Sequence, residues 1–247
     1  MSRHARILTP VLIVAALTAS AQTSPSVRHR IDAYMTAIAA AESGETARGV
    51  ESALTAVADL KQALLAHVPG STKSVLEDLP EADFALLEQL PGVTVRRVEV
   101  LVVHPIPRFF SDLATRVGDR ADQRFAAALV ATHPESHWPV YVEPQTDYSG
   151  CTAFGDGRLL EVYLAWSAME RDFPGRYESA VSRQRDAVEE KITRSTCACG
   201  DSASVVEELK RIVAALTPED PIFSAVRQRL AATEAGRSNI RFGCIPR

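Results

Sequence analysis

The chain has 247 residues and a formal net charge of −4, from 31 acidic and 27 basic side chains. This mildly acidic balance excludes the strongly basic surface with which proteins bind nucleic acids or anionic membranes. The length suits one domain, or two small ones, with enough chain to bury a hydrophobic core.

The first 21 residues have the layout of a secretory signal peptide. A short basic start precedes a mostly apolar run over residues 7–18, and Ala19-Ser20-Ala21 matches the small-x-small cleavage site. The apolar run is shorter than the roughly 20 residues that a membrane-spanning helix needs. We therefore expect cleavage after about Ala21 and a periplasmic or secreted mature chain without a membrane span. That chain would carry 25 basic and 31 acidic side chains, a net charge of −6.

Apolar residues at helical spacing predict that most of the chain is helical. A helical hairpin is expected over residues 22–70, with a break at residues 42–46 and an end at Pro69-Gly70. A domain boundary near residue 70 would separate this hairpin from a second domain, residues 71–247. The next predicted helix is short and lies between Leu79 and Gly92.

The middle of the chain supplies the predicted β element. Val93–Val103 is rich in β-branched residues and predicts one strand that is buried on both faces. Two helices are expected over residues 109–117 and 121–131. A second short strand is expected over residues 138–142, and a loop follows through Gly157.

The last third returns to helical periodicity, with helices expected over residues 159–172, 177–194, 205–216 and 220–230. The helix over residues 177–194 is highly charged, and we interpret its run Arg183 to Lys191 as a solvated face with ion pairs. Residues 239–242 are a candidate terminal strand. The fold class is therefore a mainly helical α+β domain, with about two to three central strands and a disulfide-stapled C-terminal half.

The four cysteines are Cys151, Cys197, Cys199 and Cys244. In an exported protein paired thiols form disulfides, and a bond between the two cysteines of Thr196-Cys197-Ala198-Cys199-Gly200 would be strained. We expect one of these two cysteines to pair with Cys151 and the other with Cys244, with the connectivity left open. A four-thiolate metal cluster and a redox pair are the alternatives, but a Cys-x-Cys spacing is tighter than a zinc knuckle.

A possible metal motif lies in His133-Pro134-Glu135-Ser136-His137. Two histidines four residues apart can share one helix face and hold zinc. Pro134 and Pro139 leave little helix for this, so the alternative is a helix end and a turn with both histidines partly exposed. His133 and His137 are the candidate metal ligands.

A second candidate site depends on how two strands pair. If residues 98–103 and 138–142 lie parallel, His104 and Glu143 both follow carboxyl ends of strands, where α/β sheets bind ligands. Asp147 would then lie within reach, and this trio is the candidate catalytic set for a general base or a metal. Arg108 and Tyr148 are candidate binding residues nearby. An antiparallel pairing would separate His104 from Glu143.

Familiar catalytic motifs are absent from the sequence. It contains no G-x-S-x-G elbow, no phosphate loop and no G-x-G-x-x-G fingerprint. Gly155-Asp156-Gly157 is a turn signal and lacks the ligand spacing of a calcium loop. No cofactor is indicated.

These observations favour an exported binding or interaction protein of the cell envelope without catalytic activity, of the inhibitor, immunity or accessory type. Its partner would be another envelope protein. The alternative is an envelope hydrolase, with or without a metal, that uses His104, Glu143 and Asp147. A third hypothesis is a binder of small ligands in the same region. A cleft would favour the last two, and a broad apolar patch would favour a protein partner.

Overall fold

The computed structural model describes residues 25–44, 46–146 and 148–244, which form ten helices and four short strands. The helices are α1 (Pro25–Ser43), α2 (Gly49–Leu65), α3 (Val75–Asp78), α4 (Glu81–Glu88), α5 (Pro107–Val117), α6 (Arg120–Thr132), α7 (Arg158–Asp172), α8 (Glu178–Arg194), α9 (Ser202–Ala215) and α10 (Phe223–Glu234). The strands are β1 (Val93–Arg97), β2 (Leu101–Pro105), β3 (Val142–Pro144) and β4 (Gly150–Thr152).

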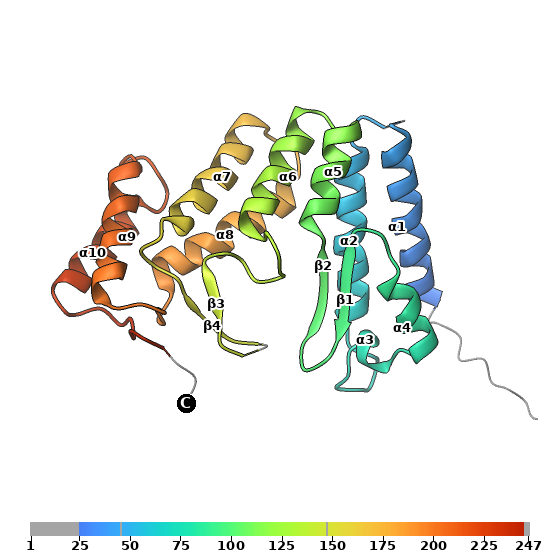
Figure 1. Cartoon of the computed structure of the whole chain (residues 1–247), viewed down its shortest axis with the longest axis horizontal. Helices are drawn as coiled ribbons and strands as arrows, with labels where there is room; N and C mark the ends of the chain where they lie inside the picture. The colour runs from blue at the N-terminus through green and yellow to red at the C-terminus, as the bar shows by residue number, and fades with distance from the viewer. Residues whose placement is uncertain (1–24, 45, 147, 245–247) are drawn as a thin grey trace, which may run out of the picture.

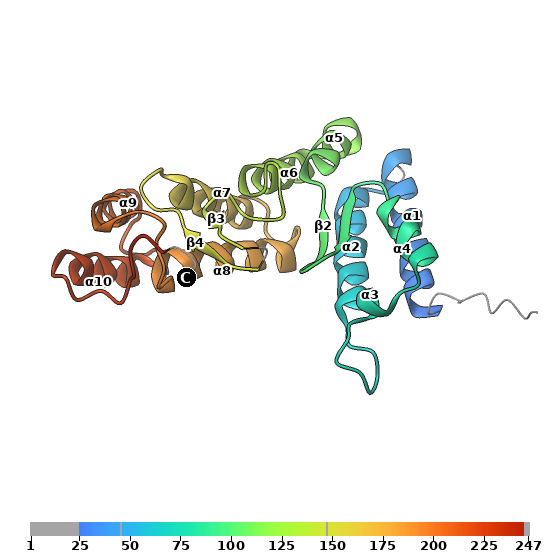
Figure 2. The ribbon, with the colours of Figure 1, turned by 60° about the horizontal axis from the view of Figure 1, so that its bottom comes forward.

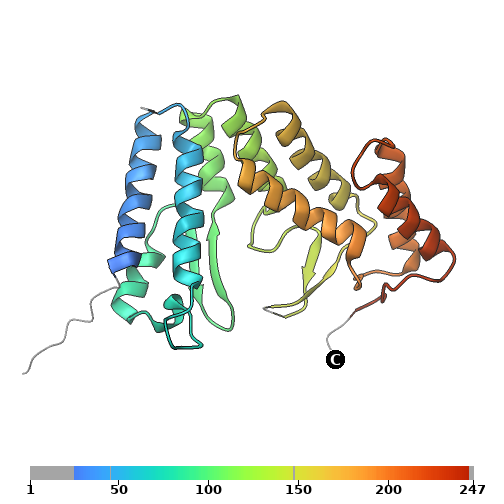
Figure 3. The same cartoon turned by 180° about the vertical axis from the view of Figure 1, so that it is seen from behind.

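The helices form an elongated row that follows the chain from one end to the other. Antiparallel neighbours pack in chain order, with α1 and α2 at one end and α9 and α10 at the other (Figure 1). In the view of Figure 2, α5, α6, α7 and α9 form one layer, and α8 and α10 lie below it. Both pairs of strands extend from the same side of the row, as Figures 1 and 3 show.

Local sequence explains why the main helices form where they do. In α2 the buried side chains recur three or four residues apart, at Val50, Ala53, Val57, Leu60 and Leu64, so one face is apolar throughout. The start of α6 is a reciprocal cap, in which the side chains of Asp119 and Asp122 each accept the other's backbone N–H. These signals place α2 and α6 where the predicted helices lie.

Two buried apolar clusters meet at α6. The first contains the inner faces of α1 to α5 and of β1, and the second contains those of α7 to α10. Ala126 belongs to the first cluster, whereas Phe125 and Leu129 belong to the second. At the centre of the second cluster the fully buried Trp166 donates its indole N–H to Thr132 Oγ1 at 2.9 Å. The helix α6 therefore connects the two halves of the molecule.

The predicted single strand over Val93–Val103 is wrong. The segment is the antiparallel hairpin β1–β2, whose register pairs Arg97 with Leu101 and Thr94 with His104. Val98, expected to be buried, lies at the turn and is 68% exposed. The segment has no Gly, Pro or Asn to mark the turn. Arg97 at the end of β1 joins the hairpin to the preceding segment by an ion pair with the exposed Glu81 at 2.6 Å, a hydrogen bond to the Leu79 carbonyl oxygen and a contact with the ring of Phe84.

The parallel pairing of residues 98–103 with residues 138–142, on which the candidate catalytic set was conditional, does not form. β3 and β4 form a second antiparallel hairpin, separate from the first, in which Glu143 lies opposite Cys151. Each strand pairs with its neighbour in the chain, since a short loop closes such a hairpin at little entropic cost. The described residues thus contain four strands rather than the expected two to three.

The segment Thr196 to Gly200 is a hub between two other parts of the chain. Disulfides join Cys151 to Cys199 and Cys197 to Cys244, with Cα separations of 5.0 and 5.8 Å. On one side the hub bonds to Thr152 of β4, and on the other to Arg241, through backbone hydrogen bonds of 2.9–3.0 Å. The expected pairing of each hub cysteine with a distant one is confirmed, and the connectivity that the sequence left open is resolved.

The expected fold class, a mainly helical domain with a small β element and a disulfide-stapled C-terminal half, is confirmed. The predicted terminal strand is reduced to an isolated bridge between Arg241 and Cys197. The predicted signal peptide lies outside the described residues. Among the helices of the described part, none is both long enough and apolar enough to cross a membrane.

Candidate functional site

Two cavities meet at the end of β2. The smaller, of about 380 Å³, lies between the β1–β2 hairpin and the loop that follows α6. The larger, of about 790 Å³, lies between α2 and α8. His104 and Pro105 line both cavities, so this point of the hairpin is the natural centre of a candidate site.

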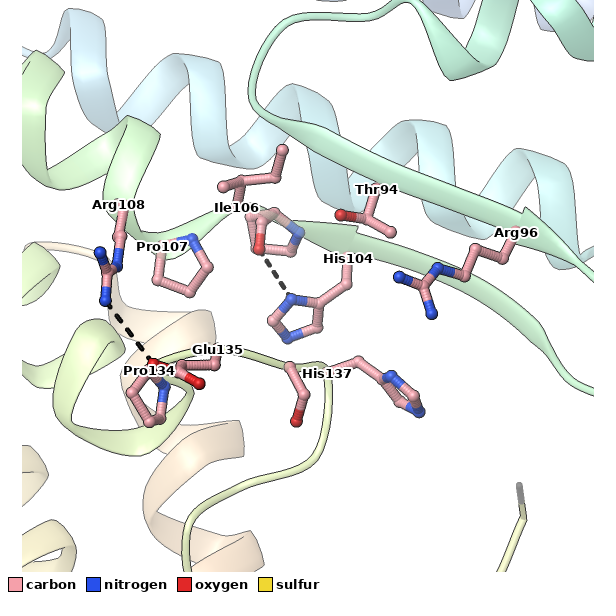
Figure 4. A pocket seen from close by; sticks show the side chains of 11 residues that line it. Thr94, Arg96, His104, Ile106, Pro107, Arg108, Pro134, Glu135 and His137 are labelled. Atoms are coloured by element: carbon pink, nitrogen blue, oxygen red, sulfur yellow. Dashed lines mark hydrogen bonds and ion pairs between the residues drawn. The ribbon is translucent and has the colours of Figure 1, made fainter. Parts of the chain in front are cut away.

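The smaller cavity is polar at both ends. Figure 4 shows His104 projecting from β2 toward the loop after α6, with Arg108 and Glu135 at one end and Arg96 and His137 at the other. Arg108 and Glu135 form an ion pair of 3.9 Å, and both side chains are largely exposed. Such an exposed pair contributes little to stability.

His104 packs against a second histidine. Its ring centroid lies 4.7 Å from that of His133, which terminates α6 and is only 6% exposed. Nδ1 of His104 is 2.7 Å from the carbonyl oxygen of Pro105. A carbonyl oxygen can only accept, so Nδ1 carries the proton and Nε2 is left as an acceptor. Nδ1 of His133 is buried without a hydrogen-bond partner.

Both histidines are neutral at pH 7. Burial is the largest of the effects that lower the pKa of His104 to about 4; the neighbouring His133, Lys61 and His137 add to it, and the Pro105 carbonyl opposes it. Burial also lowers the pKa of His133, although the Gln184 side chain opposes this. The pair is therefore a hydrogen-bonding and packing unit at neutral pH rather than a positive charge.

The larger cavity is a groove with an apolar floor and polar walls. Figure 3 shows α2 and α8 on the same face of the molecule, with α6 behind them. The apolar side chains that line the groove are Leu54, Val57, Ala58, Leu65, Phe125, Leu129 and Ala180. The polar walls include Lys61 and Gln62 on α2 and Arg183 and Gln184 on α8. We call this cavity the α2–α8 groove.

One end of the α2–α8 groove is fixed by a dense ionic network. Arg176, just before α8, contacts Glu51, Asp119 and Asp122 at 2.8, 2.6 and 2.7 Å. Tyr177 donates its hydroxyl to Asp122 at 2.6 Å and its backbone N–H to Glu51 at 2.7 Å. Its ring stacks on Phe125 with centroids 3.9 Å apart. These contacts join α2, α6 and α8, so the groove is preformed at this end.

Two cations face the same groove without a counterion. Lys61 on α2 and Arg183 on α8 form no ion pair with any carboxylate of the described residues. Burial lowers the pKa of Lys61, and the nearby Arg183 guanidinium lowers it further. Both side chains are exposed along the groove, and the positive charge of Arg183 disfavours the charged form of Lys61.

The predicted catalytic trio does not share a strand edge. His104 lies on β2 of one hairpin and the exposed Glu143 on β3 of the other. Asp147 lies outside the described residues. The Glu143 carboxylate is within 4.8 Å of the sulfurs of Cys151 and Cys199. These sulfurs form a disulfide, so they cannot act as thiolate ligands there.

The helix α6 ends at Thr132, so His133 and His137 do not share a helix face. The expectation that both are partly exposed is wrong for His133, because its ring packs against His104. Among the described residues, neither histidine belongs to a group of three or more His, Cys, Asp or Glu side chains whose ligand atoms converge.

The candidate binding residues lie on separate elements. Arg108 is in the first turn of α5 and lines the smaller cavity. Tyr148 lies in the turn between β3 and β4 and is 73% exposed. Neither residue lines the α2–α8 groove.

The turn at Gly155 to Gly157 has a structural explanation. Oε2 of Glu208, a fully buried residue on α9, accepts the backbone N–H of Gly155 at 3.2 Å and of Gly157 at 2.9 Å. Arg211 contacts the same oxygen at 2.9 Å. Both glycines have positive φ angles. A carboxylate on a neighbouring helix therefore holds this turn.

Comparison with protein-family models, with curated proteins and with solved structures finds no match for this chain.

Sequence reasoning missed most of the α2–α8 groove. Lys61 lies in a predicted helix for which only the apolar face was interpreted. Arg183 was interpreted as part of a solvated face. For Arg185 that interpretation is confirmed, since it pairs with Glu170, Asp186 and Glu189. Charge spacing gave no signal for Arg183, because Asp186 lies three positions after it, just as Glu189 lies four positions after Arg185.

Proposed function

We propose that this chain is an exported binding protein of the cell envelope without catalytic activity, and that it takes a small ligand in the α2–α8 groove. The observation that carries the proposal is the groove itself, with a volume of about 790 Å³, an apolar floor and polar side chains along its walls. Ligand sites of proteins have volumes of roughly 300–1,000 Å³ and this same composition. A cleft favours a small ligand over the flat surface of a protein partner.

The rigidity of the groove supports binding. The ionic network of Arg176 and the stacking of Tyr177 on Phe125 hold α2, α6 and α8 together before any ligand enters. A preformed site loses less conformational entropy when it binds than a site that must first become ordered. The groove is therefore suited to retaining a ligand.

The surroundings of His104 favour binding over the hydrolase alternative. Its ring faces the Pro105 carbonyl, His133, Lys61 and His137. Among the described residues, the carboxylate that lines the smaller cavity with it, Glu135, is paired with Arg108. Glu143, which was to complete the catalytic set, belongs to the other hairpin. A general base needs its partner within hydrogen-bonding reach.

The cysteines support an envelope location. Two disulfides join segments 48 and 47 positions apart, and such bonds persist in oxidising compartments. The signal-peptide pattern of residues 1–21 agrees with export. The oxidised mature chain is accordingly the form in which binding should be measured.

A neutral fluorescent probe, N-phenyl-1-naphthylamine, tests the proposal. We expect the oxidised protein to bind one equivalent, because the probe is apolar and fits the groove floor. Ala58 lines the groove, so Ala58→Trp should fill it and weaken binding at least tenfold. The matched control is Ala203→Trp, at an exposed position in the first turn of α9, which should bind as the unmodified protein does.

The proposal is wrong if the unmodified protein does not bind the probe. It is equally wrong if Ala58→Trp, shown by its unfolding curve to be folded, binds the probe as well as Ala203→Trp does.

A further inference from the structure

We propose that the ligand of the α2–α8 groove is an organic anion, whose acidic group is held between Lys61 and Arg183 while its apolar part lies on the groove floor. This inference rests on the proposed function, since it names the chemical class of ligand for the same groove. The acidic group is a carboxylate, sulfonate or phosphate on an aromatic or aliphatic body.

The first support is the placement of the two cations. Lys61 belongs to α2 and Arg183 to α8, so they come from the two opposite walls and both line the groove. Burial and, after it, the charge of Arg183 lower the pKa of Lys61, and both side chains are exposed, so a ligand can reach them. Holding two like charges close together costs free energy unless an opposite charge lies near both. An anion between them removes this repulsion.

The second support is the state of the groove's own carboxylates. Glu51 is engaged by Arg176 and by the backbone N–H of Tyr177, and Asp59 pairs with Arg30 at 3.6 Å. Glu178 begins α8 and precedes Arg183 by five residues, about 7.5 Å of helix rise. None of the three is recorded as an ion-pair partner of Lys61 or Arg183 in the described residues.

The third support is the surroundings of the cation pair. The amides of Gln62 and Gln184 line the same walls and can donate hydrogen bonds to an anion. The floor consists of aliphatic and aromatic side chains, against which the apolar part of a ligand can pack. A guanidinium and an ammonium together present several donors to one acidic group.

The size of the groove argues for an organic ligand. Its volume of about 790 Å³ far exceeds that of a hydrated inorganic ion and is matched by a ligand with an apolar body. The formal charge of the whole chain is −4, so long-range attraction does not explain the binding of an anion. Recognition would depend on the local pair of cations.

A matched pair of dyes tests this inference. N-phenyl-1-naphthylamine and 8-anilino-1-naphthalenesulfonate share one ring system, and the second adds a sulfonate. We expect the oxidised protein to bind the sulfonate dye about tenfold more tightly than the neutral dye, the gain typical of a charge-assisted contact. Lys61→Gln/Arg183→Gln should reduce this preference to less than about threefold while leaving the neutral dye bound.

The control variant is Lys73→Gln/Arg237→Gln. It removes the same total charge at two exposed positions that do not line the groove, and it should keep the tenfold preference. Inorganic phosphate at millimolar concentration should displace the sulfonate dye poorly, since it lacks an apolar part.

Each remaining outcome has one meaning. If both dyes bind equally and Ala58→Trp weakens both, the groove binds ligands but the anion inference is wrong. The inference is also overturned if Lys61→Gln/Arg183→Gln weakens both dyes to the same extent, or if the control variant loses the preference. If neither dye binds, the proposed function fails and the anion inference fails with it.

Discussion

The imidazole rings of His104 on β2 and His133 at the end of α6 contact each other, with centroids 4.7 Å apart and ring planes tilted by 60°. The two residues lie 29 positions apart in the chain, and both of their elements line the α2–α8 groove, β2 through His104 and α6 through Phe125 and Leu129. Their contact ties the β1–β2 hairpin to the helix that connects the two apolar clusters. Protonation of either ring would place a charge in a largely buried position.

Acidification should therefore destabilise the protein. His104 has a folded-state pKa of about 4, against an ordinary value of 6.5, so the unfolded chain binds its proton at a higher pH than the folded chain does. Stability is full above about pH 6.5 and is lost as the pH falls from there toward 4, by up to about 3 kcal/mol for this residue. The free energy of unfolding in urea, determined at several pH values between 7.5 and 4, measures this loss of stability.

A matched pair of variants identifies the histidine responsible. His104→Gln should lose less stability than the unmodified protein over this pH range, because its unfolded state gains no proton at this position. His29→Gln, an exposed position on α1, should show the full loss. Equal losses in the two variants would contradict the assignment to His104.

The two disulfides can be separated by double variants. Cys151→Ala/Cys199→Ala and Cys197→Ala/Cys244→Ala each remove one bridge, of 48 and 47 positions, and each should lower the free energy of unfolding by about 2–4 kcal/mol. Each purified variant should contain no free thiol after denaturation. Cys151→Ala/Cys197→Ala removes both bridges and should be the least stable of the three. If it is instead the most stable, the connectivity is the reverse one.

The sequence predicts features that are set by residues close together in the chain, and it fails for features that are set by contacts between distant residues. The helices α2 and α6 follow from apolar spacing and capping residues within a few positions, so the pattern placed them correctly. The cysteine pairing followed from spacing and compartment. The β1–β2 turn at Val98 to Val100 contains no turn signal, and the contacts that Arg97 makes with Glu81, Leu79 and Phe84 form only in the folded chain.

The candidate site depends on contacts that no local pattern contains. Lys61 and Arg183 lie more than a hundred positions apart, and each belongs to a helix whose charged side chains ordinarily face water. They become neighbours only because α2 and α8 flank α6. His104 was singled out correctly as a notable residue, but its partner is His133 and not Glu143, since the strands form hairpins rather than one parallel sheet.

The ionic network at the end of the α2–α8 groove should contribute strongly to stability. Arg176 contacts three carboxylates, and its side chain and that of Asp122 are 14% and 3% exposed. Arg176→Met leaves the buried carboxylate of Asp122 and the partly buried carboxylate of Glu51 without a counterion, which costs about 3–5 kcal/mol. Arg116→Met breaks an exposed pair with Glu42 and should change stability by less than about 1 kcal/mol. Denaturant unfolding compares them, and similar losses would contradict the role of Arg176.

Any side chain at Gly92, which connects α4 to β1, should lower the free energy of unfolding. The φ angle of Gly92 is +72°, and a Cβ atom there would overlap the ring of Phe109. Gly70 has almost the same angle, +76°, with nothing within 4 Å of such an atom. Alanine at either position adopts a left-handed conformation that costs roughly 1–2 kcal/mol, but only at Gly92 must the packing of Phe109 also change.

The difference between Gly92→Ala and Gly70→Ala isolates that contact. Gly92→Ala should be less stable by about 1–3 kcal/mol, the usual cost of overpacking, measured as the difference in free energy of unfolding in urea. The backbone strain cancels in the comparison because the two φ angles agree within a few degrees. If the variants are equally stable, Phe109 moves away without loss, and the start of the β1–β2 hairpin, which presents His104 to both cavities, is less tightly packed than its geometry indicates.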